Sequence, residues 1–319
     1  MGTVLAVLRE IFPPHPVWGV NDIPDLTGKV FLVTGGNSGV GKETVKALLL
    51  HNARVYIAAR SQVKCEEAIE ELKTATGKEA HFLQLDLSDL HSVRNAATTF
   101  TAKEKELHVL INNAGVMMPP VEQLTKDGYD LQFGTNVLGH FLFTQLLIPT
   151  LLASSTPSSP ARVVTVASTA ALLTGRIDYT TLTPGPARTH LGKQGLYIQS
   201  KLGNAIFAQE LARRYGDQGI VSVALNPGSI KTDLYRHNDG AVLRFVQLQN
   251  LITQPVELGA LTPLYAATHP DGASFNGKFF IPWARPAKLH AQALDPAAGK
   301  ELWDWLETQV TKVFNGSEA

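Results

Sequence analysis

The chain has 319 residues, of which 44% are hydrophobic and 18% are charged, enough to bury the core of a single large α/β domain. Its 28 basic and 28 acidic residues balance, so charge gives no case for nucleic acid or an anionic surface and favours a small, roughly neutral partner. The only cysteine, Cys65, excludes an internal disulfide and a thiol metal cluster, and we expect it to lie on a helix face without chemistry.

Residues 1–25 are predicted to form an N-terminal extension ahead of a main domain at 26–319. Val4 to Phe12 can form a short amphipathic helix, which Pro13-Pro14 ends well short of the ~20 apolar residues of a membrane span. This helix could rest on a membrane or dock on the domain, and we favour docking because its face has no basic cluster for lipid headgroups. No secretory leader precedes the domain, so a cytoplasmic location is expected.

The main domain opens with a strand that turns directly into a helix. The apolar run Val30–Thr34 breaks into glycines at Gly35, Gly39 and Gly41, after which apolar residues recur at helical spacing. The first N–H groups of such a helix lack partners and attract anions, and glycine lets a phosphate approach the main chain. The turn therefore predicts a pyrophosphate site, although a strand–helix turn without a ligand has the same pattern.

A second strand at 54–59 and a charged helix at 62–76 complete a β-α-β unit. In dinucleotide folds that prefer NAD, an acidic residue at the end of this strand binds the ribose 2′-hydroxyl. Ala59 and Arg60 stand there in this chain, and an arginine can donate two hydrogen bonds to a 2′-phosphate. We therefore favour NADP over NAD; the alternative for Arg60 is a solvated loop charge.

The third and fourth predicted strands also end in candidate site residues. The strand at 80–85 is followed by Asp86-Leu87, where Asp86 could serve to cap the next helix. The strand at 108–111 runs into Asn112-Asn113-Ala114-Gly115, at the kind of strand end where open α/β sheets bind ligands. An ordinary turn would explain these four residues equally well when they are taken alone.

Chemistry-bearing residues recur in the second half of the chain. A strongly apolar helix is predicted from Asp130 to about Leu152, and within it the amide of Asn136 needs a hydrogen-bond partner. A β-branched strand at 162–167 ends at Ser168. Farther on, Tyr197-Ile198-Gln199-Ser200-Lys201 opens a helix that runs to about Tyr215 and places the tyrosine and the lysine on one face, one turn apart.

The remaining predicted elements close the sheet. A sixth strand at 220–225 runs into Asn226-Pro227-Gly228, and a last strand is predicted at 278–281. A C-terminal helix is predicted at 300–310, with its apolar residues on one side.

In chain order, the motifs T-G-x-x-x-G-x-G, N-N-A-G, S…Y-x-x-x-K and P-G-x-x-x-T resemble the short-chain dehydrogenase/reductase family over about residues 26 to 282. The resemblance implies a single-domain α/β fold of the Rossmann type: a doubly wound parallel sheet of about seven strands with helices on both faces. It also implies that the protein is an oxidoreductase that uses NADP(H) and needs no metal.

The residues that match the family's catalytic positions are Asn136, Ser168, Tyr197 and Lys201. By the same matching, Asp86 is expected to contact the adenine ring. The positions expected to bind the cofactor are Gly35, Asn37, Ser38, Gly39, Val40, Gly41, Arg60, Asp86, Leu87, Asn113, Ala114, Gly115, Tyr197, Lys201, Pro227, Gly228, Ile230 and Thr232.

Carbonyl chemistry explains why these residue types are needed. Hydride transfer builds negative charge on the carbonyl oxygen, which must then receive a proton from a positioned donor. We expect Tyr197 to be that donor, or the base in the oxidative direction, with the Lys201 ammonium favouring its phenolate. The resemblance implies that Lys201 also holds the nicotinamide ribose, that Ser168 orients the substrate oxygen, and that Asn136 holds a water linking Lys201 to solvent.

The long Ser–Tyr interval, with an insertion at about 169–196, is similar to that of the retinol-dehydrogenase branch, whose members act on lipophilic carbonyls. The insertion should shape specificity at the mouth of the site. A substrate lid is predicted at about 229–256, where Val242, Leu243, Val246 and Leu251 could form an apolar surface. The candidate substrate residues are Met117, Leu172, Leu234 and Trp283.

The first interpretation is therefore an NADPH-dependent carbonyl reductase, or alcohol dehydrogenase in reverse, for a hydrophobic substrate. Two alternatives stay open: an NAD-dependent alcohol dehydrogenase of the same fold, and a redox-silent NADP-binding sensor or scaffold. By analogy with the family, the helices near 130–152 and 197–215 are expected to pair between subunits in a homodimer or homotetramer.

Overall fold

The computed structural model describes residues 2–231 and 253–316. One sheet forms its centre, with the strand order β3-β2-β1-β4-β5-β6-β7-β8. Neighbouring strands are parallel from β3 to β7, and β8 pairs antiparallel with β7. The strands are β1 (Val30–Thr34), β2 (Arg54–Ala59), β3 (His81–Gln84), β4 (Val109–Asn112), β5 (Ala161–Val166), β6 (Ile220–Leu225), β7 (Phe279–Ile281) and β8 (Arg285–Ala287).

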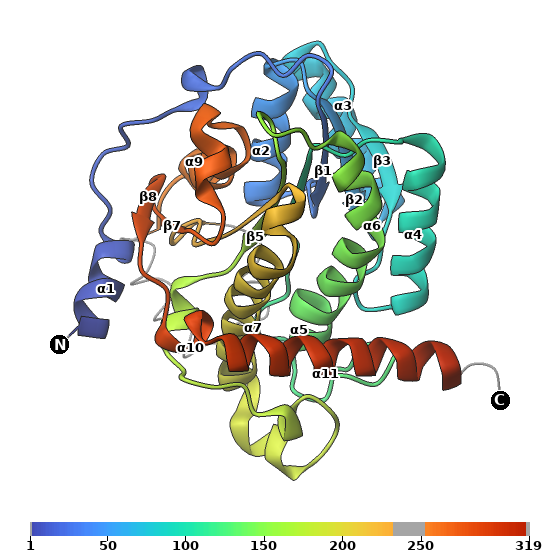
Figure 1. Cartoon of the computed structure of the whole chain (residues 1–319), viewed down its shortest axis with the longest axis vertical. Helices are drawn as coiled ribbons and strands as arrows, with labels where there is room; N and C mark the ends of the chain where they lie inside the picture. Colours follow the sequence, from blue (N-terminus) through green and yellow to red (C-terminus); the bar gives the residue numbers. More distant parts are fainter. Residues whose placement is uncertain (1, 232–252, 317–319) are drawn as a thin grey trace.

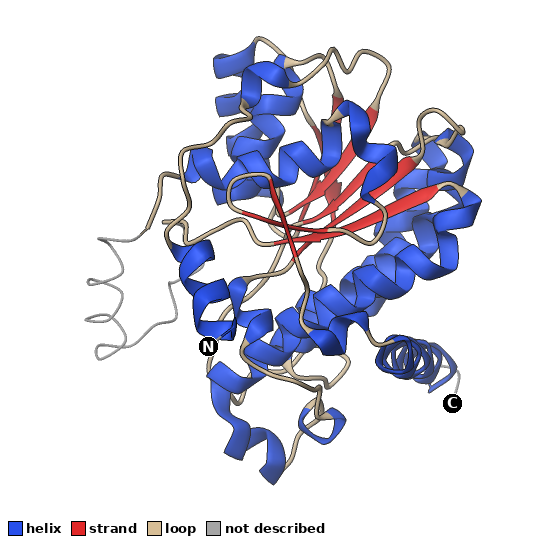
Figure 2. Ribbon diagram, turned by 60° about the vertical axis from the view of Figure 1, so that its left-hand side comes forward, coloured by secondary structure: helices blue, strands red, loops and turns tan. Residues whose placement is uncertain are grey.

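Helices cover both faces of this sheet, as Figure 2 shows. The longer helices are α1 (Gly2–Ile11), α2 (Gly39–Leu50), α3 (Gln62–Thr76), α4 (Leu90–Lys103), α6 (His140–Ser154), α7 (Pro186–Tyr215), α9 (Val256–Thr268) and α11 (Pro296–Asn315). The shorter helical segments are η1 (Val20–Asp22), α5 (Leu131–Phe133), η2 (Gly134–Gly139), η3 (Thr169–Leu172), η4 (Tyr179–Thr181), η5 (Gly216–Gln218), η7 (Pro270–Phe275) and α10 (Ala291–Leu294).

Side chains along each buried strand point alternately to the two faces of the sheet, so the core has two layers, one on each face. Val30 and Leu32 of β1 pack with residues of α4, α6, α7 and α11, whereas Phe31 and Val33 pack with residues of α2, α3 and α9. Successive strand side chains point to opposite faces, so a strand buried on both sides must be apolar throughout. This explains why β1 is a continuous hydrophobic run and confirms the predicted doubly wound fold.

Within residues 2–231 and 253–316 the sheet has eight strands instead of about seven. The additional strand, β8, has only three residues, and its middle residue is the exposed Pro286. A proline is tolerated on an edge strand because no neighbour needs its missing N–H. Such a short segment carries no apolar run, which is why the sequence pattern did not indicate it.

Most predicted elements lie within a residue or two of their observed bounds, but three helices differ. The C-terminal helix predicted at 300–310 is longer and spans Pro296–Asn315. The apolar helix predicted from Asp130 contains a π-helical segment, η2, between α5 and α6. The helix predicted to open at Tyr197 belongs to α7, which begins within the insertion at Pro186 and continues across a kink at Gly192 (φ 68°). Tyr197 therefore lies inside a helix and not at its start.

The C-terminal helix α11 lies across α7, as Figure 1 shows. The ring centroid of Trp303 lies 5.1 Å from that of Phe141 in α6 and 6.2 Å from that of Phe207 in α7. The chain's own α11 thus covers part of the surface that was expected to pair between subunits.

Within the described residues, one helical stretch, Leu131–Ser154, is long and apolar enough to cross a membrane. Its most apolar part is 72% buried inside the domain. Burial against α4 and α7 accounts for this composition, because a helix packed on several sides needs no polar face.

Candidate active site

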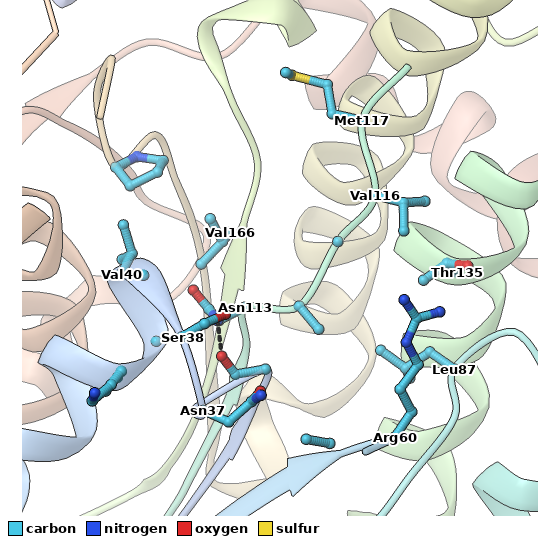
Figure 3. Close-up of a pocket in the computed structure, with 18 of the residues that line it drawn as sticks. Asn37, Ser38, Val40, Arg60, Leu87, Asn113, Val116, Met117, Thr135 and Val166 are labelled. Atoms are coloured by element: carbon cyan, nitrogen blue, oxygen red, sulfur yellow. Dashed lines mark hydrogen bonds between the residues drawn. The ribbon is translucent and has the colours of Figure 1, made fainter. Parts of the chain in front are cut away.

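A cavity of about 1190 Å³ opens at the carboxyl ends of the central strands. The residues that follow β1, β2, β4, β5 and β6 all reach it, among them Gly35, Arg60, Asn113, Ser168 and Asn226. Open α/β sheets bind ligands at this edge, where the strand order reverses. Figure 3 shows Asn37, Ser38 and Val40 on one side of this cavity and Arg60 extending toward it from the end of β2.

The glycine turn after β1 has the geometry of an anion site. Gly35 (φ +65°) and Gly39 (φ +52°) adopt backbone angles that residues with a Cβ avoid. A Cβ on Gly41 would lie 2.6 Å from Nδ2 of Asn113, closer than atoms can approach. Ser38 precedes α2 and its side chain makes no capping hydrogen bond. The first N–H groups of α2 are therefore directed at the cavity without a side-chain cap.

The N-N-A-G segment is tied to the end of β1. The backbone N–H groups of Asn113 and Ala114 donate to Oγ1 of Thr34 at 2.9 and 3.0 Å. Asn113 Nδ2 also donates to the Thr34 carbonyl oxygen, at 2.8 Å. These bonds hold the backbone of Asn113, Ala114 and Gly115 against the cavity, where the small side chains leave room for a ligand.

Asn136 lies in the π-helical segment η2 and is fully buried. Its Oδ1 accepts from the Val116 N–H at 2.9 Å, and its Nδ2 donates to the Val116 carbonyl at 3.1 Å and to Ser200 Oγ at 3.0 Å. The amide therefore has structural partners, and it stands behind the cavity wall at Gly115 instead of lining the cavity.

Ser168, Tyr197 and Lys201 line the same cavity. Ser168 follows β5 and caps η3, where its Oγ accepts from the Ala170 N–H at 3.2 Å. Tyr197 and Lys201 share one face of α7 and are 7% and 5% exposed. The Lys201 ammonium lies 5.9 Å from the centroid of the Tyr197 ring.

The Lys201 ammonium is held in place by the end of β5. Its Nζ donates to the Val166 carbonyl at 3.0 Å, and Asn204 Nδ2 donates to the same oxygen at 3.2 Å. Burial disfavours the charged form and lowers the pKa of Lys201 to about 8. The group is thus still mostly an ammonium at neutral pH, yet it is close to its titration range.

The insertion is joined to the cavity wall by buried polar contacts. Arg188 donates from Nε and Nη2 to Oδ2 of Asp130 at 3.2 and 3.1 Å, and both side chains are buried. Gln132 donates from Nε2 to the Lys193 carbonyl at 2.8 Å and accepts from the Met118 N–H at 2.9 Å. The insertion and the segment after Gly115 are therefore positioned by the same short stretch at α5.

Every predicted cofactor position within the described residues lines this cavity. They are Gly35, Asn37, Ser38, Gly39, Val40, Gly41, Arg60, Asp86, Leu87, Asn113, Ala114, Gly115, Tyr197, Lys201, Pro227, Gly228 and Ile230. One carboxylate oxygen of Asp86, Oδ1, already accepts hydrogen bonds from the N–H and the hydroxyl of Ser88. Thr232 lies outside the described residues.

The substrate predictions have mixed outcomes. Met117 lines the cavity, but Leu172 and Trp283 do not. Trp283 is instead buried against the turn at Gly228, where a Cβ would lie 3.1 Å from its ring, and Leu172 ends η3 without reaching the cavity. Leu234 and most of the predicted lid, 232–252, lie outside the described residues.

Sequence reasoning missed several lining residues, namely Val116, Leu131, Thr135 and Gln194. Leu131 and Thr135 are four residues apart, a spacing that places both side chains on one helix face, so either residue could have pointed to the other. Gln194 lies two residues after the kink at Gly192, for which the sequence has no comparable signal.

Comparisons with known proteins agree with this geometry. The family model described as short chain dehydrogenase matches residues 29–181. A short-chain dehydrogenase/reductase of Armillaria gallica is 56% identical over 309 residues, covering 97% of this chain and 99% of the relative. The chain belongs to the short-chain dehydrogenase/reductase family.

Three further similarities extend this comparison. Human retinol dehydrogenase 11 is 41% identical over 281 residues, covering 88% of this chain and 85% of the relative, which supports the retinol-dehydrogenase-like branch. A solved structure of an uncharacterised protein from Mycobacterium paratuberculosis superimposes with a TM-score of 0.71 at 31% identity, covering 92% of this chain and 97% of that one. The NADP complex of RhlG from Pseudomonas aeruginosa superimposes with a TM-score of 0.63 at 26% identity, covering 81% and 95%.

Proposed function

We propose that this short-chain dehydrogenase/reductase transfers a hydride between NADPH and the carbonyl of a hydrophobic aldehyde or ketone, with Tyr197 as the proton donor or base. One observation carries the proposal: Ser168, Tyr197 and Lys201 line the same cavity as the glycine turn of the expected pyrophosphate site. A proton donor and an anion site in one cavity suit a reaction between a dinucleotide and a carbonyl compound.

The cavity fits a dinucleotide cofactor. Its floor is backbone at Gly35, Gly41 and Gly115, where an added Cβ would collide with neighbouring atoms or narrow the space. The uncapped start of α2 offers N–H donors to a pyrophosphate. When bound, the cofactor supplies or accepts the hydride, and the chain has to hold it, exclude water and manage the proton.

Arg60 is the observation that favours NADP. It lines the cavity directly after β2, where an NAD-preferring enzyme has an acid. Lys64 and Lys42 also line this region, although Lys42 pairs with Glu71. A planar guanidinium that can donate two hydrogen bonds fits the terminal phosphate of NADP, and the NADP complex of RhlG shows that a structural neighbour binds this cofactor.

The proton is handled by Tyr197 and its neighbours. The ammonium of Lys201, 5.9 Å from the tyrosine ring, lowers the free energy of a phenolate, so the phenol can give its proton to the developing oxyanion. Ser168 stands at the end of β5 with a hydroxyl that can donate to the same oxygen. The Asn136 amide donates both of its hydrogens, to the Val116 carbonyl and to Ser200 Oγ, and accepts from the Val116 N–H, so in this proposal it positions the segment after Gly115.

The proposed substrate is hydrophobic. Beyond the cofactor positions, the lining residues include Val116, Met117, Met118 and Leu131. These side chains offer apolar surface and no charge, which favours a substrate whose only polar feature near the reacting carbon is the carbonyl. The similarity to a protein named retinol dehydrogenase supports the same class.

Purified protein tests the proposal through NADPH oxidation with a panel of hydrophobic aldehydes and ketones. Tyr197→Phe removes only the hydroxyl, and Tyr179→Phe, outside the cavity, is the matched control. We expect turnover with wild type and with Tyr179→Phe, and none with Tyr197→Phe although it still binds NADPH. Tight NADPH binding without turnover of any carbonyl, or of the matching alcohols with NADP, would favour the sensor alternative.

A further inference from the structure

A carboxylate of the N-terminal helix reaches the ends of two central strands. Glu10 lies in the last turn of α1 and is only 3% exposed. Its Oε2 accepts from Oγ1 of Thr169 and from Nδ2 of Asn226, each at 2.7 Å. Asn226 Nδ2 also donates to Oγ1 of Thr169 at 2.7 Å. Three side chains from distant parts of the chain therefore form a closed triangle of hydrogen bonds.

The donors and acceptors of this triangle match. The two hydrogens on Nδ2 of Asn226 serve Glu10 and Thr169, and the hydroxyl hydrogen of Thr169 serves Glu10. Asn226 Oδ1 accepts from the Gly228 N–H at 3.0 Å and so fixes the turn that follows β6. A fully matched buried network specifies one arrangement, whereas a network that loses one member leaves buried groups unsatisfied.

Arg285 of β8 holds the same turn of α1 from the other side. Its Nη2 donates to the Arg9 carbonyl at 2.8 Å, and its Nε donates to the Pro282 carbonyl at 2.5 Å. Burial raises the pKa of the Glu10 carboxyl, while the hydrogen bonds from Thr169 and Asn226 and the charge of Arg285 act against that rise. The carboxyl is therefore enclosed by specific partners and not by apolar side chains alone. Figure 1 shows α1 beside β8.

The contacted residues stand next to cavity residues. Thr169 directly follows Ser168, and Asn226 directly precedes Pro227 and Gly228. The strands β5 and β6 are paired up to Val166 and Leu225, and beyond this pair the bond from the Ala167 N–H to the Leu225 carbonyl, at 2.7 Å, continues the ladder. The Asn226–Thr169 hydrogen bond makes the next connection between the two segments, just where they enter the site, and Glu10 accepts a hydrogen bond from each of its members.

We propose that Glu10 is a positioning residue of the active site, and that α1 is through it a structural part of the catalytic centre. The inference rests on the proposed function, because it assigns Ser168 and the turn at Gly228 to that reaction. Glu10 does not line the cavity, so its effect passes through Thr169 and Asn226. It fixes the direction of the Ser168 hydroxyl and the position of the turn at Gly228.

Three variants of the full chain test this inference. Glu10→Ala removes the acceptor, and Glu10→Gln keeps an oxygen that can accept both hydrogen bonds. Arg9→Ala is the matched control, because exposed Arg9 contributes only its backbone carbonyl. We expect Glu10→Ala to lower kcat about tenfold or more, the equivalent of one lost hydrogen bond to a charged group, with the KM for NADPH nearly unchanged. Glu10→Gln should recover most of kcat, and Arg9→Ala should match wild type.

Amide hydrogen exchange of the cofactor-free protein gives a readout that does not depend on activity. Glu10→Ala should speed exchange in peptides covering 167–173 and 226–231, while Glu10→Gln and Arg9→Ala exchange as wild type does. Unchanged exchange and kcat in Glu10→Ala would overturn the inference, and so would faster exchange spread evenly over the whole protein. If wild type reduces no carbonyl while the local exchange effect is present, the proposed reaction fails, but the positioning of Thr169 and Asn226 by Glu10 stands.

Discussion

His140 Nε2 lies 2.8 Å from Oγ1 of Thr34, and this contact joins the helix that carries Asn136 to the end of β1. The other ring nitrogen, Nδ1, lies 3.0 Å from the carbonyl oxygen of Asn136. A carbonyl can only accept, so Nδ1 carries the proton and Nε2 accepts from the Thr34 hydroxyl. The same hydroxyl receives the N–H groups of Asn113 and Ala114. One neutral histidine thus links the cofactor turn, the N-N-A-G segment and the π-helical segment η2.

Replacing this ring removes two buried hydrogen bonds. We expect His140→Leu to lower the free energy of unfolding by about 1–3 kcal/mol, because Thr34 and Asn136 each keep an unsatisfied group. Chemical denaturation monitored by circular dichroism measures the loss. An equal stability of the two proteins would show that the histidine only fills space.

The same residue predicts how stability depends on pH. Burial lowers the pKa of His140 from 6.5 to about 4, so between these values the unfolded chain binds a proton that the folded protein does not. Stability should therefore fall as the pH is lowered from 6.5 toward 4. His140→Leu should lack this part of the slope, and parallel pH profiles of the two proteins would contradict the assignment.

We expect Lys201 to be required for turnover and to lower the free energy of unfolding. Its pKa is about 8 in the folded protein and 10.5 in the reference state, so folding at neutral pH places a charge where burial disfavours it. We expect Lys201→Met to abolish turnover and to stabilise the cofactor-free protein by about 1–3 kcal/mol at about pH 7. The difference in stability between Lys201→Met and wild type should disappear as the pH rises from about 8 to 10.5. Denaturant melts at neutral pH and near pH 10 check this, and a destabilised methionine variant at neutral pH would contradict it.

Arg60 should decide between the two cofactors. Arg60→Ala removes a charged hydrogen-bond donor to the 2′-phosphate, worth about 1.5–3 kcal/mol, and should raise the KM for NADPH about ten- to a hundredfold. The KM for NADH, which has no such phosphate, should change little. Arg94→Ala, whose guanidinium lies over the Phe314 ring, serves as the control. Equal losses with both cofactors would count against the assignment of NADP.

The oligomeric state stays a prediction, and the structure restricts the surface it can use. Trp303 and Leu306 of α11 are buried on the side of α6 and α7 that was expected to meet a partner. We expect that any homodimer forms without a direct α6–α7 contact between subunits. Sedimentation with cross-linking and mass spectrometry tests this, and intersubunit cross-links between the midpoints of α7 would contradict it.

The sequence was sufficient for those features that depend on local pattern. The end of the first strand at Thr34, the end of the fourth strand to within one residue, and the helix spacing of Tyr197 and Lys201 were predictable, because buried strands and short motifs set them locally. Contacts between distant residues were not. Glu10 with Asn226 and Arg188 with Asp130 depend on the packed fold, and neither pair has a spacing that a single sequence reveals. The π-helical turn at Asn136 was hidden for another reason, since its apolar pattern is that of an ordinary helix.

The central claim is that the chain moves a hydride from NADPH to a carbonyl carbon with the help of Tyr197. The most direct measurement follows deuterium from NADPH labelled at the transferring nicotinamide position into the alcohol product by mass spectrometry. With the best hydrophobic carbonyl of the panel, wild type should place the label on the former carbonyl carbon, while Tyr197→Phe binds NADPH and forms almost no labelled product. Product that carries no label, or a phenylalanine variant as fast as wild type, would contradict the account.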